Sequence, residues 1–343
     1  MGVPSLTNGE RNMKLCIGSG GLSQESVITR PEDLRTFSLG GEKHGKHSNL
    51  GWALDQLLGH CRGFLQGDGW KKKCQVFYPA FSHHGTTSRA DSTEIAARKS
   101  AHYLPSTHSD SAAAKQREPF SFRITYNLLE DYTTEWRKYN DRMVRSRRVI
   151  GLRTPLVLFY ESYEAGDITL VNASRLDEII LTNLDVMVHA ITWAITLIAD
   201  NKHVQHELHE EVNANRDNLQ EYLPRSDTHL HRSFLETIRL QTPAILVKPG
   251  GEDSEDFRPS RFKNIKATDL RYNMAIFGFG SRKCPGQYVA AQGVKALLVH
   301  ILRQYDIEVI KERTDGKSHD TGKAQVIPMA DVIVRLSIKS NGR

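Results

Sequence analysis

The amino-acid sequence predicts a mostly α-helical protein with a minor β component. Apolar residues recur at helical spacing within residues 49–81 and 287–305, and residues 176–212 form the longest helical run without glycine or proline. Two short β-rich runs, residues 306–310 and 331–338, close the chain. With 343 residues, 39% of them hydrophobic and 25% charged, the chain is long enough to bury a large core.

The first residues differ in composition from the rest. Residues 1–26 are rich in glycine, serine and polar side chains, so we expect a poorly ordered leader followed by one folded domain over residues 27–343. The elements expected next are a short strand at 27–30, a short helix from Pro31, helices over 49–81 on either side of Gly67–Gly69, a helix and polar loop over 82–118, and mainly helix over 120–163.

Three helices are expected in the second half of the chain. Residues 176–212 are apolar nearly all round in the middle, which indicates a helix buried through a core. Residues 228–240 predict a shorter helix that ends before Pro243. Residues 287–305 predict an amphipathic helix whose apolar stripe is Val294, Leu297, Leu298, Ile301 and Leu302.

Charge and cysteine content exclude several classes of protein. Four cysteines without a C-x-x-C pair are too few for a disulfide scaffold or a thiolate zinc site. Neither a signal peptide nor an apolar stretch long enough to span a bilayer is visible. The net charge of +6 is compatible with an ordinary solvated basic surface. It is also compatible with binding to a nucleic acid, an anionic membrane surface or an acidic protein partner. A basic cluster formed by Arg142, Arg145, Arg147 and Arg148 is either a solvated helix face or a patch that faces lipid or a partner.

The segment from Phe277 to Gly286, FGFGSRKCPG, has the chemistry of a metal-binding turn. Its glycines permit a tight turn and close approach to a flat or bulky group. Pro285 is suited to the first turn of a helix, whose positive end then faces the sulfur of Cys284 and favours the thiolate. Arg282 is well placed to meet a carboxylate.

This segment matches the pattern F-x-x-G-x-R-x-C-x-G at every specified position, and the chain therefore resembles the cytochrome P450 family. The resemblance implies haem b, with Cys284 as the axial thiolate ligand of the iron, Arg282 beside a haem propionate and Phe277 packed against the sulfur. Gly286 would allow the close approach. A thiolate ligand favours cleavage of the O–O bond, the basis of monooxygenase chemistry.

Other segments extend the resemblance. Glu236 and Arg239 match the family's E-x-x-R element, and with Arg261 they would form an ion-pair cluster that braces the haem-binding core. Trp70 resembles the start of a W-x-x-x-R element that contacts a propionate. Cys74 replaces its arginine, which one of the three intervening lysines would have to substitute.

The helix over residues 176–212 resembles the family's oxygen-activating helix. Asp185 falls at the position of the proton-relaying acid, whereas Val186 replaces the usual threonine. Because valine has no hydroxyl, proton delivery would depend on Asp185 through water or on His189 one turn further on. A rival zinc hypothesis rests on His203, His206 and His209, but their spacing is more typical of a polar helix surface.

The resemblance also implies partners and a location. Electrons would come from NADPH through cytochrome P450 reductase and oxidise a small organic substrate in fungal secondary metabolism, with no nucleic acid involved. The segment from Leu176 to Met187 resembles P450s of dityrosine-type and gliotoxin-like pathways. Family members face the cytosol on the endoplasmic reticulum. Without a visible anchor, we expect this chain in the cytoplasm or in peripheral contact with a membrane.

Relative to the family, we expect a P450 fold that is incomplete in two places. One is the N-terminus, where an anchor, a hinge and a first helical segment are expected. The other is the β-sheet region between the E-x-x-R helix and the haem loop, reduced to residues 242–257. Lost strands expose sheet edges and remove part of the pocket wall. The alternative to a working enzyme is therefore a truncated, catalytically impaired P450 that binds haem poorly or not at all.

Overall fold

Helices make up most of the part of the chain that the structure, a computed structural model, describes. It describes residues 14–16, 25–27, 35, 67–103, 126–169, 177–242, 256–265, 270, 274–278, 280, 283–312 and 332–339. The helices are α3 (Gly67–Phe81), α4 (His83–Thr87), α5 (Ala90–Tyr103), α6 (Tyr126–Val149), α7 (Pro155–Glu164), α9 (Asp177–Asp200), α10 (Lys202–Ala214), α11 (Leu219–Tyr222), α12 (His229–Leu240) and α14 (Gln287–Gln304), with 3₁₀ turns η3 (Pro259–Phe262) and η4 (Ala275–Phe277). The strands are β1 (Lys14–Cys16), β2 (Glu25–Val27), β3 (Tyr305–Glu312) and β4 (Val332–Ile338).

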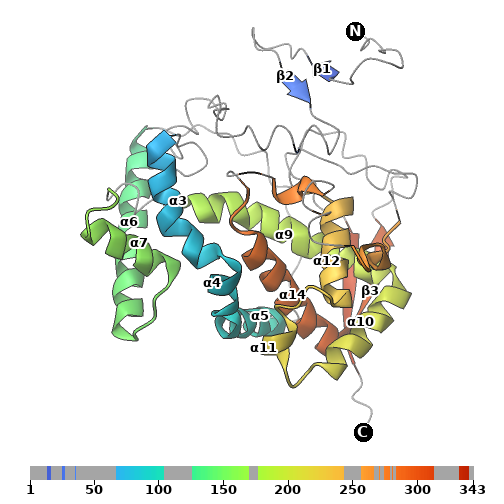
Figure 1. Ribbon diagram of the computed structural model, residues 1–343. Coiled ribbons are helices and arrows are strands. Elements are labelled where there is room, and N and C mark those ends of the chain that lie inside the picture. Colours follow the sequence, from blue (N-terminus) through green and yellow to red (C-terminus); the bar gives the residue numbers. More distant parts are fainter. Residues whose placement is uncertain are drawn as a thin grey trace.

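Helix α14 runs through the centre of the main core, between α5, α9, α10 and α12 (Figure 1). Val294, Leu298 and Ile301 are buried, as the predicted apolar stripe requires. The predicted helix and its apolar stripe are confirmed, but burial extends beyond the stripe, because Gln292 and Lys295 are buried as well. Neighbouring helices cover α14 on several sides, and a sequence pattern does not show this.

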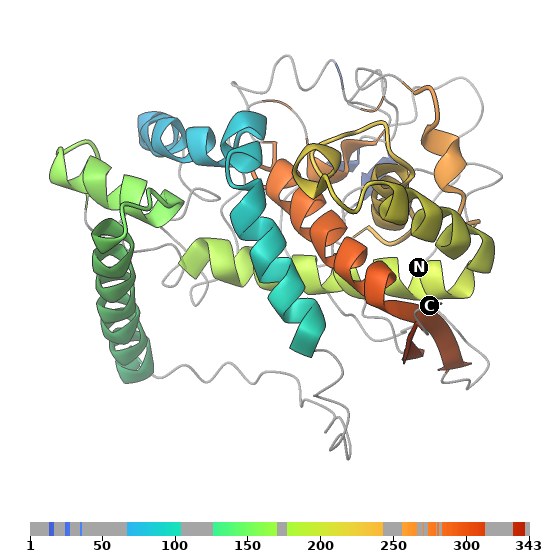
Figure 2. The ribbon, with the colours of Figure 1, turned by 90° about the horizontal axis from the view of Figure 1, so that it is seen from below.

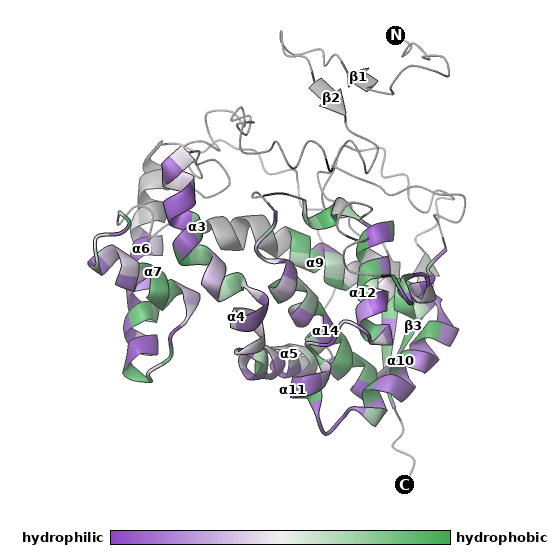
Figure 3. Cartoon of the chain, viewed as in Figure 1, coloured by the Kyte–Doolittle hydropathy of each residue, from purple (hydrophilic) through white to green (hydrophobic). Residues whose placement is uncertain are grey.

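The outer helices keep one polar face. Along α10 and α12 the ribbon alternates between hydrophilic and hydrophobic residues (Figure 3). On α10 the buried residues include Val204, Leu208 and Val212, spaced four apart, which is the spacing of one helix face. Helix α12 begins where Thr228 caps it, its hydroxyl accepting a hydrogen bond from the backbone N–H of His231 at 3.0 Å.

The long helix predicted over residues 176–212 is two helices. Helix α9 ends at Asp200 and α10 begins at Lys202, because Asn201 leaves helical geometry with φ −111° and ψ 79°. The Asn201 side-chain amide donates to the carbonyl of Leu197 at 2.8 Å, one of the last carbonyls of α9. The expectation of one uninterrupted helix is therefore wrong, although both halves are helical.

Strand β3 pairs antiparallel with β4, which confirms the two β-rich runs predicted at the end of the chain. On its other edge β3 is bound by a side chain instead of a strand. The amide of Gln205 on α10 accepts from the backbone N–H of Ile307 at 3.1 Å and donates to its carbonyl at 2.9 Å. This buried amide satisfies both backbone groups and so ties β3 to α10.

A second, smaller core joins α3, α6 and α7, set to one side of the main core (Figure 2). Phe77 and Phe159 meet in it edge to face at 5.4 Å between ring centroids. The basic cluster predicted on α6 lies largely on its exposed face. Arg148 binds Glu164 of α7 through two hydrogen bonds of 2.9 and 2.8 Å, so one member of the cluster closes the α6–α7 turn.

Strands β1 and β2 pair antiparallel, Lys14 opposite Val27. Strand β2 shares only Val27 with the strand expected at residues 27–30, and residues 28–30 lie outside the described residues. The remainder of residues 1–26 and the shortened region at 243–255 lie outside the described residues, so the boundary at residue 27 and the loss of sheet stay predictions. Among the helices that the structure describes, none combines the length and the apolar character needed to cross a bilayer.

Candidate functional site

The cysteine loop connects η4 to the start of α14. The backbone N–H of Cys284 donates to the carbonyl of Phe277 at 2.7 Å and closes the loop. Gly278 and Gly280 have φ values of +72° and +65°, in the left-handed region where a side chain would be strained. Gly280 of the pattern and Gly278, at an unspecified position, are therefore both favoured by the backbone, which brings Phe277 next to Cys284.

Cys284 lies half-buried just before the first turn of α14. Gly286 is the N-cap of this 18-residue helix, and its carbonyl accepts from the N–H of Ala290 at 2.8 Å. The unpaired N–H groups and the positive dipole end of α14 favour a thiolate at this position. The role of Cys284 as a metal ligand stays a prediction, and this placement is compatible with it.

The donor set around Cys284 fits a haem iron better than a protein-ligated metal. Within the described ranges no three His, Cys, Asp or Glu side chains gather as metal ligands. A structural zinc would need about four such ligands, whereas haem iron already has four porphyrin nitrogens and takes one axial thiolate from the protein. A single half-buried cysteine at a helix N-terminus is suited to that role.

Helix α9 crosses α14 close to this loop. A Cβ added to Gly293 of α14 would lie 3.4 Å from the terminal methyl of Met187, so the two helices are in contact there. Asp185 and Val186 therefore belong to the turn of α9 next to this crossing. Val186 is half-buried, and the side chain of Asp185 lies outside the described set.

His189, the second candidate for proton delivery, is held elsewhere. It is fully buried, and its Nε2 lies 2.9 Å from the carbonyl of Gln241 at the end of α12. Since a carbonyl only accepts, Nε2 carries the proton and ties α9 to α12. The structure thus gives His189 a positioning contact, and the ring is turned toward α12.

The remaining predicted site residues are placed as follows. Trp70 stands in the first turns of α3, with Cys74 one turn further and buried. Of the three lysines between them, Lys73 is buried and the other two are exposed. Lys73 is therefore the lysine to consider as a substitute for the family's arginine. Arg282 lies outside the residues described.

The predicted ion-pair cluster is confirmed and is larger than expected. Arg239 donates to the Glu236 carboxylate from Nε at 2.7 Å and from Nη2 at 2.9 Å. Arg261 adds Nε at 3.3 Å, and the backbone N–H of Arg258 adds a bond of 2.9 Å. Glu236 is completely buried, so these bonds fix α12 to η3. The backbone donor could not be read from the side-chain pattern.

Comparisons with known proteins agree with this site. The family model described as "Cytochrome P450" matches residues 252–332. The chain is 28% identical to cytochrome P450 monooxygenase sirC of Leptosphaeria maculans, over 93% of this chain and 80% of that protein. It is 24% identical to cytochrome P450 monooxygenase gliC of Aspergillus fumigatus, over 84% of this chain and 76% of that one.

These matches support assignment of the chain to the cytochrome P450 family. A crystal structure of a cytochrome P450 (CYP102L1) has the same fold, with a TM-score of 0.65 over 92% of this chain and 89% of that one at 16% identity. The predicted P450 fold, mostly helical with little sheet, is therefore confirmed. Because its curated relatives are fungal P450 monooxygenases, this P450 is an enzyme of the oxidoreductase class.

The three histidines of the rival zinc hypothesis each approach a different carboxylate. His203 lies 3.7 Å from Glu207 and His206 lies 3.8 Å from Glu210. Both side chains are mostly exposed, as predicted for a polar helix surface. His209 departs from that prediction, because only 16% of its side chain is exposed.

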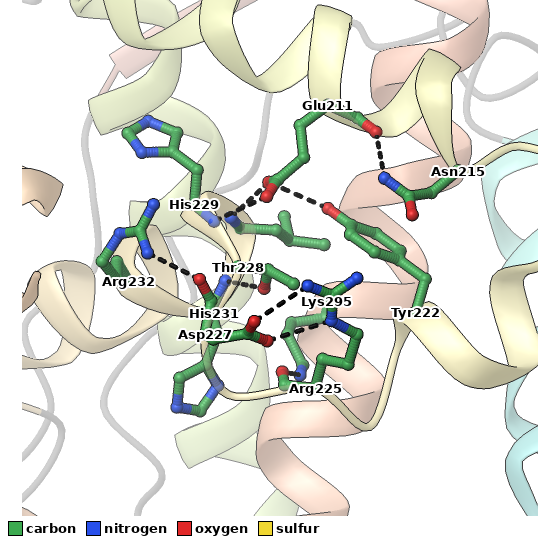
Figure 4. A network of polar contacts seen from close by, with 11 residues as sticks. Glu211, Asn215, Tyr222, Arg225, Asp227, Thr228, His229, His231, Arg232 and Lys295 are labelled. Carbon is green, nitrogen blue, oxygen red and sulfur yellow. Dashed lines mark hydrogen bonds and ion pairs between the residues drawn. The ribbon is translucent and has the colours of Figure 1, made fainter.

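Sequence reasoning missed a partly buried polar network at the start of α12 (Figure 4). The Glu211 carboxylate on α10 accepts from the backbone N–H groups of His229 at 2.8 Å and Leu230 at 2.9 Å. It also accepts from the Tyr222 hydroxyl at 3.0 Å. An acid at a helix N-terminus is favourable, but this one comes from another helix, and no local pattern predicts it.

Proposed function

We propose that this P450 is a haem-thiolate monooxygenase that oxidises a small organic molecule. The observation that carries the proposal is Cys284, held at the N-terminus of α14 in a loop closed by its bond to Phe277, with α9 crossing close by. Haem bound there through a thiolate would supply activation of dioxygen. The protein supplies the ligand, the shape of the site and the protons.

The roles of the individual residues follow from chemistry and position. Cys284 would be the axial ligand of haem b, Phe277 would pack beside its sulfur and Gly286 would leave room for the macrocycle. Arg282 and Trp70 would contact the propionates. Buried Lys73, one turn from Trp70, would substitute for the missing arginine as a point charge instead of a planar fork.

Asp185 is the proposed proton donor on α9. Val186 has no hydroxyl to hold a water or relay a proton, and His189 already donates from Nε2 to Gln241. This leaves Asp185, acting through water, as the acid of the site. Turnover that survives Asp185→Asn with unchanged coupling of NADPH to product would contradict this role.

The proposal also covers the electron source, the substrate class and the location of the enzyme. We infer electron supply from NADPH through cytochrome P450 reductase and a substrate from fungal secondary metabolism, a gliotoxin-like pathway being the finer hypothesis. The site would work at the cytosolic face of the endoplasmic reticulum or in the cytoplasm. The fungal P450 relatives support the fungal secondary-metabolism part of this assignment.

The first experiment is the ferrous–CO difference spectrum of the purified chain. A thiolate-ligated haem gives a Soret band near ~450 nm. We expect this band in the parent protein and its loss in Cys284→Ser. Cys74→Ser on α3 is the matched control because it makes the same substitution at another cysteine. A band that survives Cys284→Ser would disprove the ligand assignment. Failure to take up haem would instead favour the impaired-enzyme alternative.

A further inference from the structure

A cavity of about 570 Å³ lies behind the cysteine loop, between α12, α14 and α4. Side chains from all three helices line it, together with Phe277 and Gly278 of the loop. Its volume is in the range of small-molecule sites, ~300–1,000 Å³. No described residue of α9 takes part. A ligand in this cavity would therefore be separated from the space beside α9 by α14 and the loop.

The orientation of α14 explains this separation. Gly293 faces Met187 of α9, whereas Ala291 and Lys295, two residues before and after it, line the cavity. Two residues along an α-helix correspond to a rotation of about 200°. One side of α14 therefore packs against α9, and the opposite side lines the cavity.

Lys295 is a buried cation without a paired carboxylate among the described residues. Only 3% of the residue is exposed, and its Nζ makes one hydrogen bond, of 3.0 Å, to the carbonyl of Arg225. The two nearest acids are engaged elsewhere. Glu211 accepts from the start of α12 and from Tyr222, and Asp227 binds the Arg225 guanidinium at 3.0 and 2.8 Å (Figure 4).

A second donor on the same wall also lacks a partner. Gln292 is 4% exposed and lines the cavity, and its Nε2 has no hydrogen-bond partner in the part of the chain that the structure describes. It stands one turn before Lys295, on the same face of α14. A buried amide donor without an acceptor is costly, and so is a buried ammonium without a counter-ion. A ligand with two acceptor oxygens would satisfy both.

We propose that this cavity binds a small amphipathic organic acid, with its carboxylate at Lys295 and Gln292. The apolar body would lie along Phe234, Ile238 and Tyr288, which line the remainder of the cavity. The proposal concerns a site separate from the haem and does not rest on the monooxygenase function. It adds a ligand to this P450 besides the substrate.

The charges around Lys295 allow an anion to bind. Burial lowers the pKa of Lys295 to about 8, while Glu211 and Asp227 raise it, so the amine is mostly protonated at neutral pH. His231 on α12 is neutral at that pH, since burial, Lys295 and Arg232 lower its pKa to about 4. A bound carboxylate would stabilise the ammonium and raise the pKa of Lys295.

The test uses decanoate as the probe and decanol as its uncharged counterpart, titrated calorimetrically into the full-length protein as purified. We expect decanoate to bind at one site and decanol to bind at least 10-fold more weakly. Lys295→Met should weaken decanoate binding by about 10- to 100-fold, the range for a lost hydrogen bond to a charged group. Lys138→Met, at an exposed lysine of α6, should have no effect.

Two further measurements locate the site. Ala291→Trp, which fills the cavity without removing a charge, should abolish binding. If Lys295→Met fails to fold, this second variant tests the proposal in its place. Binding at pH 8 should take up about half a proton and at pH 6.5 almost none, because the ligand completes the protonation of Lys295. Buffers of different ionisation enthalpy report this uptake.

Three results would overturn the proposal. One is the absence of decanoate binding, and another is binding that is unchanged in both Lys295→Met and Ala291→Trp. The third is displacement of decanoate by an azole that ligates haem iron, because the acid would then occupy the space beside α9. A chain that takes up no haem but still binds decanoate would contradict only the proposed function.

Discussion

At the scale of single residues, the carboxylate of Glu236 accepts four hydrogen bonds within the described core. Its fully buried carboxylate receives two bonds from Arg239, one from Arg261 and one from the backbone of Arg258. Removing one partner of a buried pair leaves the other charge uncompensated, at a cost of about 3–5 kcal/mol. We therefore expect Glu236→Gln to lower the free energy of unfolding by about 3 kcal/mol, as measured in urea.

The chain provides a matched control for this substitution. Glu135 on α6 also pairs with a cation three residues along, Lys138 at 2.8 Å, but 70% of its side chain is exposed. Exposed pairs contribute about 0–1 kcal/mol, so Glu135→Gln should change the unfolding midpoint little. Equal effects of the two substitutions would show that the buried cluster does not brace the core.

His231 predicts a dependence of stability on acid. Burial holds its native pKa at about 4, below the value of about 6.5 expected in the unfolded chain. The unfolded state therefore binds more protons as the pH falls below 6.5, and stability is lost progressively between pH 6.5 and 4. His231→Gln should flatten this part of the unfolding profile. An unchanged slope would mean that His231 is not buried in its neutral form.

At the scale of elements, local sequence patterns predicted the helices and strands whose ends depend on interactions between residues close in the sequence. Helix α12 and strands β3 and β4 lie close to the positions that the sequence pattern and the following proline of α12 predict. The break at Asn201 is marked by neither glycine nor proline, and Lys202 and Gln205 just after it bind the carbonyl of Ile307 on β3, a contact that no local pattern shows. The predicted Glu236–Arg239 pair needed only helix spacing, whereas the cavity at Lys295 exists only once α12 packs against α14.

The α10–β3 connection gives a prediction at this scale. Gln205 alone binds the N–H of Ile307 and shares its carbonyl with Lys202. In Gln205→Leu the N–H would be buried without a partner, at a cost of about 2 kcal/mol in unfolding free energy. Chemical denaturation measures the loss, and Gln220→Leu on the exposed side of α11 is the control. A loss below that of the control would show that water replaces the amide.

At the scale of the whole molecule, the described residues form two cores of unequal size. The larger one joins α5, α9, α10, α12, α14 and β3, and the smaller one joins α3, α6 and α7. Helix α3 leads directly into α4, which packs against α14. Segments held by fewer buried contacts open at lower free energy than the main core. The α3–α6–α7 unit should therefore be able to unfold while α14 stays folded.

Hydrogen exchange followed by mass spectrometry tests this division. Amides of α6 and α7 should exchange faster than those of α12 and α14 in the parent protein. Phe159→Ala empties a fully buried position of the smaller core, and the resulting cavity should cost about 3–5 kcal/mol locally. It should speed exchange in α6 and α7 and leave α14 protected, whereas Leu298→Ala in the main core should speed exchange in both. If Phe159→Ala exposed α14 equally, the two cores would unfold as one unit, and the smaller core would contribute directly to the stability of the cysteine loop.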